Sequence, residues 1–210
     1  MKKIDKEFLI TILYTLVIPA ILYFILKLLQ SNYHIIISNI DSKIPFIPYF
    51  IYFYILFFPF IITIFYITYI KNKNIYYKGI KSTILGLIIT DIIFLIYPTI
   101  IYRPEINNSI DLLTRTLLNI IYFCDTPAIN CFPSIHCLLC FQVSYMIISC
   151  KEVKVKYKLI AIVLSLFIIL STLFIKQHYF YDIIGSIIIF TFSNIIINKI
   201  LINFNKKVDI

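Results

Sequence analysis

Charged residues are scarce in this chain, and that scarcity excludes most soluble folds. Only 14% of the 210 residues are charged, 61% are hydrophobic, and the mean hydropathy is +0.95. Such a composition lies outside the range of soluble globular domains. With only three His and ten acidic residues, any of them inside an apolar run is costly and suggests a function. The chain also lacks an internal repeat, a soluble segment and a long linker, so we expect one integral membrane domain over residues 1–210.

Long apolar runs predict the membrane-spanning segments. A helix needs roughly 20 residues to cross a bilayer. Six runs meet or approach that length, at about residues 8–29, 45–70, 80–102, 134–150, 158–175 and 180–203. None of them alternates apolar and polar residues, as a membrane β-barrel strand must. The sequence therefore predicts an all-α polytopic membrane protein, a bundle of six transmembrane helices. The first run lacks a small-residue cleavage site and is interpreted as a span rather than a signal peptide.

The positions of the basic residues explain the net charge of +9 without a nucleic acid partner. Fourteen of the 19 basic residues fall on one side of a six-span arrangement: Lys2, Lys3, Lys6, Lys71, Lys73, Lys78, Lys81, Lys151, Lys154, Lys156, Lys158, Lys199, Lys206 and Lys207. Because basic residues concentrate on the cytoplasmic side, both termini are predicted to be cytoplasmic. The same lysines are expected to meet anionic lipid.

The five cysteines do not form a metal-binding pattern. Cys137, Cys140 and Cys150 lie on or at the end of an apolar helix, and no pairing with His gives zinc spacing. Cys124 and Cys131 fall in an outer connection. A disulfide between them is compatible with that location, but the sequence does not decide it.

The connection over residues 103–133 contains a candidate surface helix. Pro104 is expected to end the third helix. Apolar and polar residues then mix between residues 110 and 121 as in a short amphipathic helix on the outer surface. This helix would be a lipid entrance or simply a covering loop. The charged residues of the connection are expected to be solvated: Glu105, Asp111, Arg115 and Asp125.

Three segments that are distant in sequence reach the same outer face in this topology. They are the end of the third span with Arg103, the start of the fourth with Ser134 and His136, and the start of the sixth with His178 and Asp182. Asp91 lies deeper, about 18 Å of helix below Arg103, which is too far for a shared ligand. For Asp91 a functional role and a helix–helix hydrogen bond both remain open.

The residue types in these segments suit chemistry on a phosphate. Arg103 offers a planar charged fork that matches phosphate oxygens. Ser134 adds a hydroxyl beside the free N–H groups of a helix N-terminus, which attracts anions. His136 is suited to exchange a proton with a leaving oxygen. His178 and Asp182 are four residues apart, as on one helical face, so the carboxylate can hold one imidazole nitrogen and leave the other free to attack.

These segments resemble the sequence motifs of the type 2 phosphatidic acid phosphatase superfamily, a family of integral membrane lipid phosphatases and phosphotransferases. The resemblance covers about residues 80–190, with a compatible six-helix arrangement over the whole chain. Its three motifs correspond to Tyr97 to Glu105, Asn130 to His136 and Ser171 to Asp182.

The resemblance implies roles for individual residues. His178 would attack phosphorus to give a phosphohistidine, assisted by Asp182, and His136 would protonate the leaving group. Arg103 and Ser134 would hold the phosphate of a membrane lipid. No metal and no other cofactor are implied.

Two positions depart from the family motifs. The first motif normally has Lys seven residues before its Arg, where this chain has Ile96, and the third has Arg six residues before its His, where this chain has Thr172. Lys176, two residues before His178, is a candidate replacement for one of these phosphate-binding cations. The departures make the chain look more like the inositol-phosphorylceramide synthase and sphingomyelin synthase branch.

Three functions follow from this interpretation. The first is a phosphatase that hydrolyses a lipid phosphate or diphosphate, of phosphatidic acid or polyprenyl diphosphate type. The second is a lipid phospho-headgroup transferase, which would resolve the same intermediate with an alcohol. The third is a membrane protein that binds lipid phosphate without turnover. The expected location is the plasma membrane with the active site on the extracytoplasmic face; the oligomeric state is left open.

Overall fold

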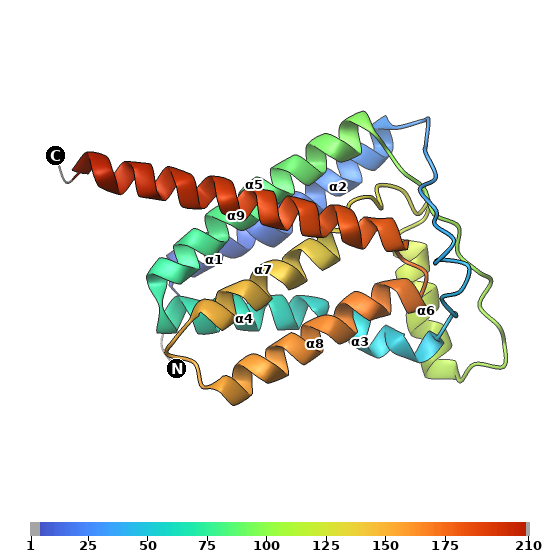
Figure 1. The fold of residues 1–210 in the computed structure, drawn as a ribbon. Helices are drawn as coiled ribbons and strands as arrows, with labels where there is room; N and C mark the ends of the chain where they lie inside the picture. Colours follow the sequence, from blue (N-terminus) through green and yellow to red (C-terminus); the bar gives the residue numbers. More distant parts are fainter. Residues whose placement is uncertain (1–4, 209–210) are drawn as a thin grey trace.

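A computed structural model describes the backbone of residues 5–208 and the side chains of residues 5–203, and it is helical throughout (Figure 1). Lys2 and Lys3 lie outside the described residues, as do the side chains of Lys206 and Lys207. The only β structure within residues 5–208 is two isolated bridges, between His34 and Thr99 and between Ile100 and Ile129. These bridges tie together the connections that follow Leu29, Ile96 and Cys124, which lie at one end of the bundle in Figure 1.

The first two predicted spans form, and a proline interrupts each of them. The first consists of α1 (Lys6–Ile12), a π-helical turn (Leu13–Val17) and α2 (Ile18–Leu29), with Pro19 in the first turn of α2. The second consists of a 3-10 turn (Pro48–Phe50), α3 (Ile51–Ile55) and α4 (Phe57–Lys71), with Pro59 near the start of α4. Because proline cannot donate a backbone hydrogen bond, the chain changes its helical form beside each one.

The third helix ends earlier than predicted. α5 spans Lys73–Ile96 and is capped at its start by the Asn72 side chain, which accepts from Ile75 N at 3.0 Å. The expectation that Pro104 ends it is wrong. Pro98 disfavours helical geometry at the residue before it, so the helix ends at Ile96 and Arg103 lies on a non-helical segment.

The fourth predicted span is a short central helix. α7 (Ile135–Ser149) rises about 22 Å, less than a bilayer core. It packs against α4, α5, α8 (Val155–Phe174) and α9 (Phe180–Val208), and more than half of its residues are buried. A helix that is apolar on all sides is expected in such a buried position.

Five helical segments in the described part of the chain are long and apolar enough to cross a membrane: Lys6–Leu29, Pro48–Lys71, Lys73–Ile96, Val155–Phe174 and Phe180–Asn203. The chain is therefore a multi-pass membrane protein by helix length and composition. α7 does not reach that length, so the sixth crossing remains a prediction.

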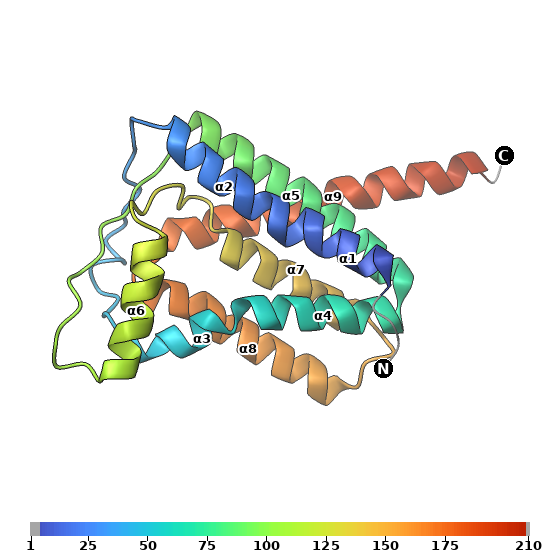
Figure 2. The same cartoon turned by 180° about the vertical axis from the view of Figure 1, so that it is seen from behind.

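The predicted helix in the 103–133 connection is present as α6 (Leu112–Cys124). The Asp111 side chain caps it by accepting from Thr114 N at 3.0 Å. Figures 1 and 2 show α6 lying across one end of the bundle, roughly perpendicular to α4 and α8. Within α6, Leu118 is buried against Ile51 and Ile175, whereas Leu112, Leu113 and Phe123 are exposed. Its contact with a membrane surface stays a prediction.

The opposite end of the bundle gathers the lysine-rich connections. The start of α1, the α4–α5 connection and the α7–α8 connection lie together there, away from α6 (Figure 1). This arrangement agrees with the predicted grouping of these connections on one side. Which side is cytoplasmic remains a prediction.

Candidate active site

The segments that carry the predicted site residues are joined at the α6 end of the bundle. Ser134 is the N-cap of α7, and its hydroxyl oxygen accepts from Cys137 N at 3.3 Å. Ser134 N donates to the carbonyl of Asp182 at 3.2 Å, and the Ser186 hydroxyl donates to the Ser134 carbonyl at 2.8 Å. These bonds fix the start of α7 against the start of α9.

His178 and Asp182 form a buried pair. Nδ1 of His178 lies 3.1 Å from Oδ2 of Asp182, and the side chains are 9% and 2% exposed. The predicted helical-face geometry is wrong in detail, because α9 begins at Phe180 and His178 precedes it. Asp182 instead reaches back over the first turn, where its Oδ2 also accepts from Tyr179 N at 2.9 Å. The carboxylate therefore holds both the imidazole and the start of the helix.

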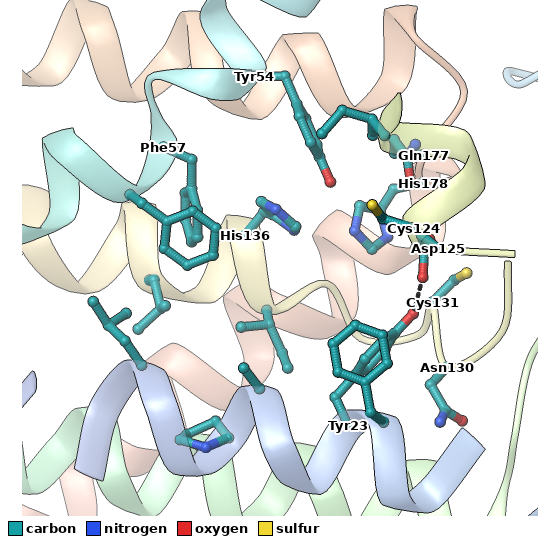
Figure 3. Close-up of a pocket in the computed structure, with 18 of the residues that line it drawn as sticks. Tyr23, Tyr54, Phe57, Cys124, Asp125, Asn130, Cys131, His136, Gln177 and His178 are labelled. Carbon is teal, nitrogen blue, oxygen red and sulfur yellow. Dashed lines mark hydrogen bonds between the residues drawn. The ribbon is translucent and has the colours of Figure 1, made fainter. Parts of the chain in front are cut away.

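His136 faces His178 across a small gap. The two ring centroids are 5.7 Å apart, and the rings are tilted by 60°. His136 packs against the rings of Tyr54 at 4.8 Å and Phe57 at 4.4 Å. Figure 3 shows both histidines bordering the same space, with the Tyr54 hydroxyl also directed into it.

Arg103 is held beside this gap by acceptors from two segments. Its guanidinium pairs with the Asp125 carboxylate, and Nη2 donates to Oε1 of Gln177 at 2.6 Å. Nη1 donates to the carbonyls of Tyr122 at 3.3 Å and Asp125 at 3.2 Å. The expectation that Asp125 is simply solvated is wrong, because the fold places it between Arg103 and the first span.

The first span contributes two residues that the sequence interpretation did not include. Nζ of Lys27 lies 3.1 Å from Oδ1 of Asp125, and the Tyr23 hydroxyl also reaches that oxygen. The Lys27 side chain is only 8% exposed. A signal for it was present: the five basic residues outside the lysine-rich side are Lys27, Lys43, Arg103, Arg115 and Lys176. A cation kept on the other side against the usual bias invites a functional explanation.

A cavity of about 450 Å³ lies beside these groups. Its polar part is bordered by His136, His178, Gln177, Asn130 and Asp125. The remainder is mostly apolar and extends along α2, α4 and α7; it includes Leu16, Pro19, Phe24, Phe57, Phe58 and Leu139. Figure 3 shows Tyr23 entering the cavity from α2, opposite Tyr54 of α3. The site is therefore a polar head attached to an apolar pocket.

Several buried polar atoms around the polar part have no hydrogen-bond partner within the described residues. They are Nε of Arg103, Nε2 of Gln177, and both Nδ2 and Oδ1 of Asn130. Asn130 is 2% exposed and adopts a left-handed backbone conformation with φ of 58°, which Asn tolerates better than most residues. Buried polar groups normally find partners, so these atoms indicate a place for a polar ligand.

None of the three predicted phosphate-binding residues borders the cavity itself, although Arg103 contacts Gln177 and Asp125, which do. Ser134 is fully buried and engaged as a helix cap, so its phosphate-binding role stays a prediction. The Lys176 ammonium donates to the carbonyls of Ile44 and Asp41 and does not border the cavity. Burial lowers the pKa of Lys176.

The sequence left open the role of Asp91 and a disulfide between Cys124 and Cys131. Asp91 lies on α5 and its Oδ1 has no hydrogen-bond partner among residues 5–203, so the structure does not supply the helix–helix bond. Cys124 and Cys131 are both free; Cys124 is exposed and Cys131 is buried. No group of three potential His, Cys, Asp or Glu metal ligands occurs in the described part of the chain.

Comparison with known proteins gives a family. No match was found among curated proteins or among solved structures. The family model described as PAP2 superfamily matches residues 41–196, which include α3 to α8, most of α9 and all three site segments. Because this match covers most of the chain, the chain belongs to the PAP2 superfamily, whose membership suggests a lipid phosphatase or phosphotransferase.

Proposed function

We propose that the protein hydrolyses a lipid phosphate or diphosphate through a phosphohistidine at His178. The observation that carries this proposal is the facing pair of histidines, 5.7 Å apart, one of them bonded to a buried carboxylate. Both border a cavity whose polar part contains unpaired hydrogen-bonding groups. This arrangement supports the proposal that a nucleophile, a proton donor and a phosphate site lie together.

His178 is suited to be the nucleophile. When its Nδ1–H donates to Asp182, the lone pair on Nε2 is free to attack phosphorus. Asp182 fixes the tautomer and stabilises the positive charge that the imidazole acquires when the N–P bond forms. The 3.1 Å contact and the near-complete burial of both side chains support this role.

His136 is suited to protonate the leaving group. In the first step the Nε2–P bond forms, the P–O bond to the lipid breaks, and the leaving oxygen takes a proton from His136. In the second step His136 takes a proton from water, and the water oxygen attacks phosphorus as the Nε2–P bond breaks. Inorganic phosphate leaves, and His178 recovers its Nε2 lone pair. The His136 side chain returns to its starting protonation state, so the cycle balances.

Arg103, Gln177 and Asn130 are suited to hold the phosphate. The free Nε–H of Arg103 and the free amide of Gln177 are hydrogen-bond donors without another partner in the described residues. Fixed donors of this kind stabilise charge that develops during phosphoryl transfer. The Tyr54 hydroxyl is a further donor at the same cavity.

The apolar part of the cavity supports a lipid as the substrate. A free phosphate or a sugar phosphate would leave the pocket along α2, α4 and α7 without an occupant. An acyl or prenyl chain would fill it and bury apolar surface, which is favourable. We place this reaction at the extracytoplasmic face of the plasma membrane, with both termini cytoplasmic, because the lysine-rich connections lie at the opposite end.

Headgroup transfer is the alternative reaction at the same site. The family motifs have a Lys and an Arg where this chain has Ile96 and Thr172. These departures favour headgroup transfer, because they resemble the inositol-phosphorylceramide synthase and sphingomyelin synthase branch. The phosphohistidine chemistry would be identical up to the second step, where an alcohol would replace water.

A lipid panel distinguishes the candidates. Purified protein in detergent would receive phosphatidic acid, phosphatidylglycerol phosphate, polyprenyl diphosphate, or a phosphodiester lipid with an alcohol acceptor. We expect phosphate release that is lost in His178→Ala but retained in His34→Ala. His34 is a matched control because its ring stacks on Tyr97 at 4.1 Å, and it does not border the cavity.

The other outcomes select the remaining functions. A new lipid product that requires the alcohol, without phosphate release, would establish transfer. Saturable lipid phosphate binding without turnover or acid-labile labelling of His178 would identify a binding protein.

A further inference from the structure

Lys27 is the buried cation of the first span, and it lies outside the matched family region of residues 41–196. We propose that Lys27 binds the phosphate of the substrate, so that the first span completes the active site. This inference rests on the proposed function and adds a binding residue to that site. The helix α2 that carries it also forms one wall of the cavity through Tyr23 and Phe24.

The charges around Asp125 leave one cation without an acidic partner of its own. Lys27 and Arg103 both contact the Asp125 carboxylate, at Oδ1 and Oδ2 respectively. Both cations have side chains less than 10% exposed. Two other acids near the site are buried: Asp182 is paired with His178, and Asp41 accepts from Phe180 N. A buried cation that is not fully compensated is costly, and an incoming anion would relieve that cost.

The hydrogen bonds of Lys27 also indicate that its ammonium can bind a ligand. A lysine ammonium has three N–H donors, and in the described residues Lys27 has one hydrogen bond, to Asp125. Asp125 does not need Lys27 to satisfy it, because Oδ1 also receives the Tyr23 hydroxyl and Oδ2 receives Arg103. The Lys27 ammonium also lies 5.4 Å from the centre of the Tyr23 ring and 5.9 Å from that of the Phe24 ring, so aromatic contacts help to hold it. Two of its N–H donors remain for a ligand.

The location of Lys27 also fits a missing motif cation. α2 packs on the last turns of α5: the rings of Tyr23 and Phe94 are 6.1 Å apart, and the Gln30 amide donates to the Phe94 carbonyl. Ile96, where the family motif has Lys, ends that same helix. Lys27 thus belongs to the helix that neighbours the end of α5, and its ammonium contacts Asp125. Lys176, the candidate suggested by the sequence, has its ammonium on Ile44 and Asp41 instead.

Asp125 acts in this scheme as a positioning residue. It holds Lys27 and Arg103 on either side of one carboxylate, while Cys124 and Asp125 themselves border the cavity. Lys27 and Arg103 do not border the cavity themselves; they meet it through Asp125, which does. In the proposed complex the phosphate in the polar part accepts from Arg103 Nε and from a free N–H of Lys27. No covalent step is assigned to Lys27.

Lys27→Gln, Lys27→Arg and Lys43→Gln test the proposal in the full-length protein. Lys43 is the matched control, because it is an exposed lysine at the same end of the bundle. For each protein we would measure kcat and KM for phosphatidic acid in mixed micelles, and the inhibition constant of inorganic phosphate. Tm with and without phosphate would be recorded in parallel.

For Lys27→Gln we expect KM and the phosphate inhibition constant to rise about tenfold or more, with kcat within about threefold of wild type. Lys27→Arg should recover most of the affinity, and Lys43→Gln should change neither constant. Unchanged KM and inhibition constant in Lys27→Gln, with a lower Tm, would overturn the proposal and make Lys27 a structural contact.

Two further measurements cover other outcomes. If Lys27→Gln does not fold, Lys27→Gln with Asp125→Asn is compared with Asp125→Asn alone, and the same tenfold rise is expected. If the wild type turns over no lipid, the proposed function fails, but the anion site is still tested by phosphate-induced stabilisation. Stabilisation that is lost in Lys27→Gln would support the site; no stabilisation of the wild type would overturn it.

Discussion

α7 has two unlike sides. Toward α5 and α9 it is closely packed: Leu138 lies against Gly86, Met146 lies against Gly79, and Gln142 accepts from the Asn194 amide at 2.9 Å. Toward α2 and α4, the residues Ile135, His136 and Leu139 border a cavity instead. One helix therefore has a closely packed side toward α5 and α9, the closed side, and a side that borders the cavity, the open side.

This difference separates two requirements of phosphoryl transfer. The closed side fixes the reacting groups, because α7 and α9 are joined through Ser134, Asp182 and Ser186 at the point where both histidines emerge. The open side provides the space and the unpaired donors that a lipid phosphate needs. Phosphoryl transfer requires the reacting groups to be held within a fraction of an ångström of their productive positions, and closely packed supporting residues provide this.

The largest effect is expected on the open side, in His136→Ala. Loss of the general acid should lower kcat for a natural lipid phosphate about 10²- to 10⁴-fold. A lipid analogue with a nitrophenol leaving group needs little protonation, so its cleavage should lose much less. Equal losses on both substrates, in protein with unchanged Tm, would contradict the general-acid assignment and favour a role in binding.

Asp125→Ala tests whether one carboxylate holds both Lys27 and Arg103 beside the cavity. Removing it leaves Lys27 and Arg103 as buried charges without their common partner, which costs about 3–5 kcal/mol of stability. We expect Tm to fall and kcat/KM for phosphatidic acid to drop about a hundredfold.

Asp111→Ala is the matched control in the same connection. Asp111 caps α6, and its loss should cost only about 1 kcal/mol without a change in kcat/KM. Similar kinetic losses in both variants would mean that Asp125 acts only by supporting α6.

A glycine pair tests the closed side. A Cβ at Gly185 would lie 2.6 Å from the Phe132 ring and 3.1 Å from Pro133, whereas a Cβ at Gly86 would lie 3.3 Å from Leu138. Gly185→Ala should shift the segment that leads into Ser134 and His136 and lower kcat about tenfold. Gly86→Ala requires only a small movement of a leucine, so its kcat should stay near wild type. Equal kcat in the two variants would show that the start of α7 is not set by this contact.

Local sequence signals predicted most helices but placed some ends wrongly. Pro133 and Ser134 mark the start of α7, and the structure begins that helix at Ile135. The end of α5 was misplaced because Pro98 stops the helix before Pro104 is reached. α7 matches the predicted bounds of 134–150 to within one residue at each end, but it is shorter than the five candidate spans, so the sixth crossing stays a prediction.

The site was predictable only where its residues lie near each other or form a motif. His178 and Asp182 are four residues apart, and their contact follows from local geometry. Lys27 and Asp125 are 98 residues apart, so only the packing of α2 against the outer connections brings them together. Asn130 is similar: its importance comes from a left-handed turn and an unpaired amide, neither of which composition reveals.

Lys176→Gln is expected to have the smallest effect, and it sharpens the contrast with Lys27. The Lys176 ammonium bonds to the carbonyls of Ile44 and Asp41, at the connection before α3, and not to a group of the cavity. Its loss should cost about 1 kcal/mol and lower Tm slightly, because hydrogen bonds to two carbonyls disappear. KM and kcat for phosphatidic acid should stay within about threefold of wild type. A rise in KM as large as that expected for Lys27→Gln would instead make Lys176 the replacement cation, and the outer connection over residues 38–44 would then have to move when the lipid binds.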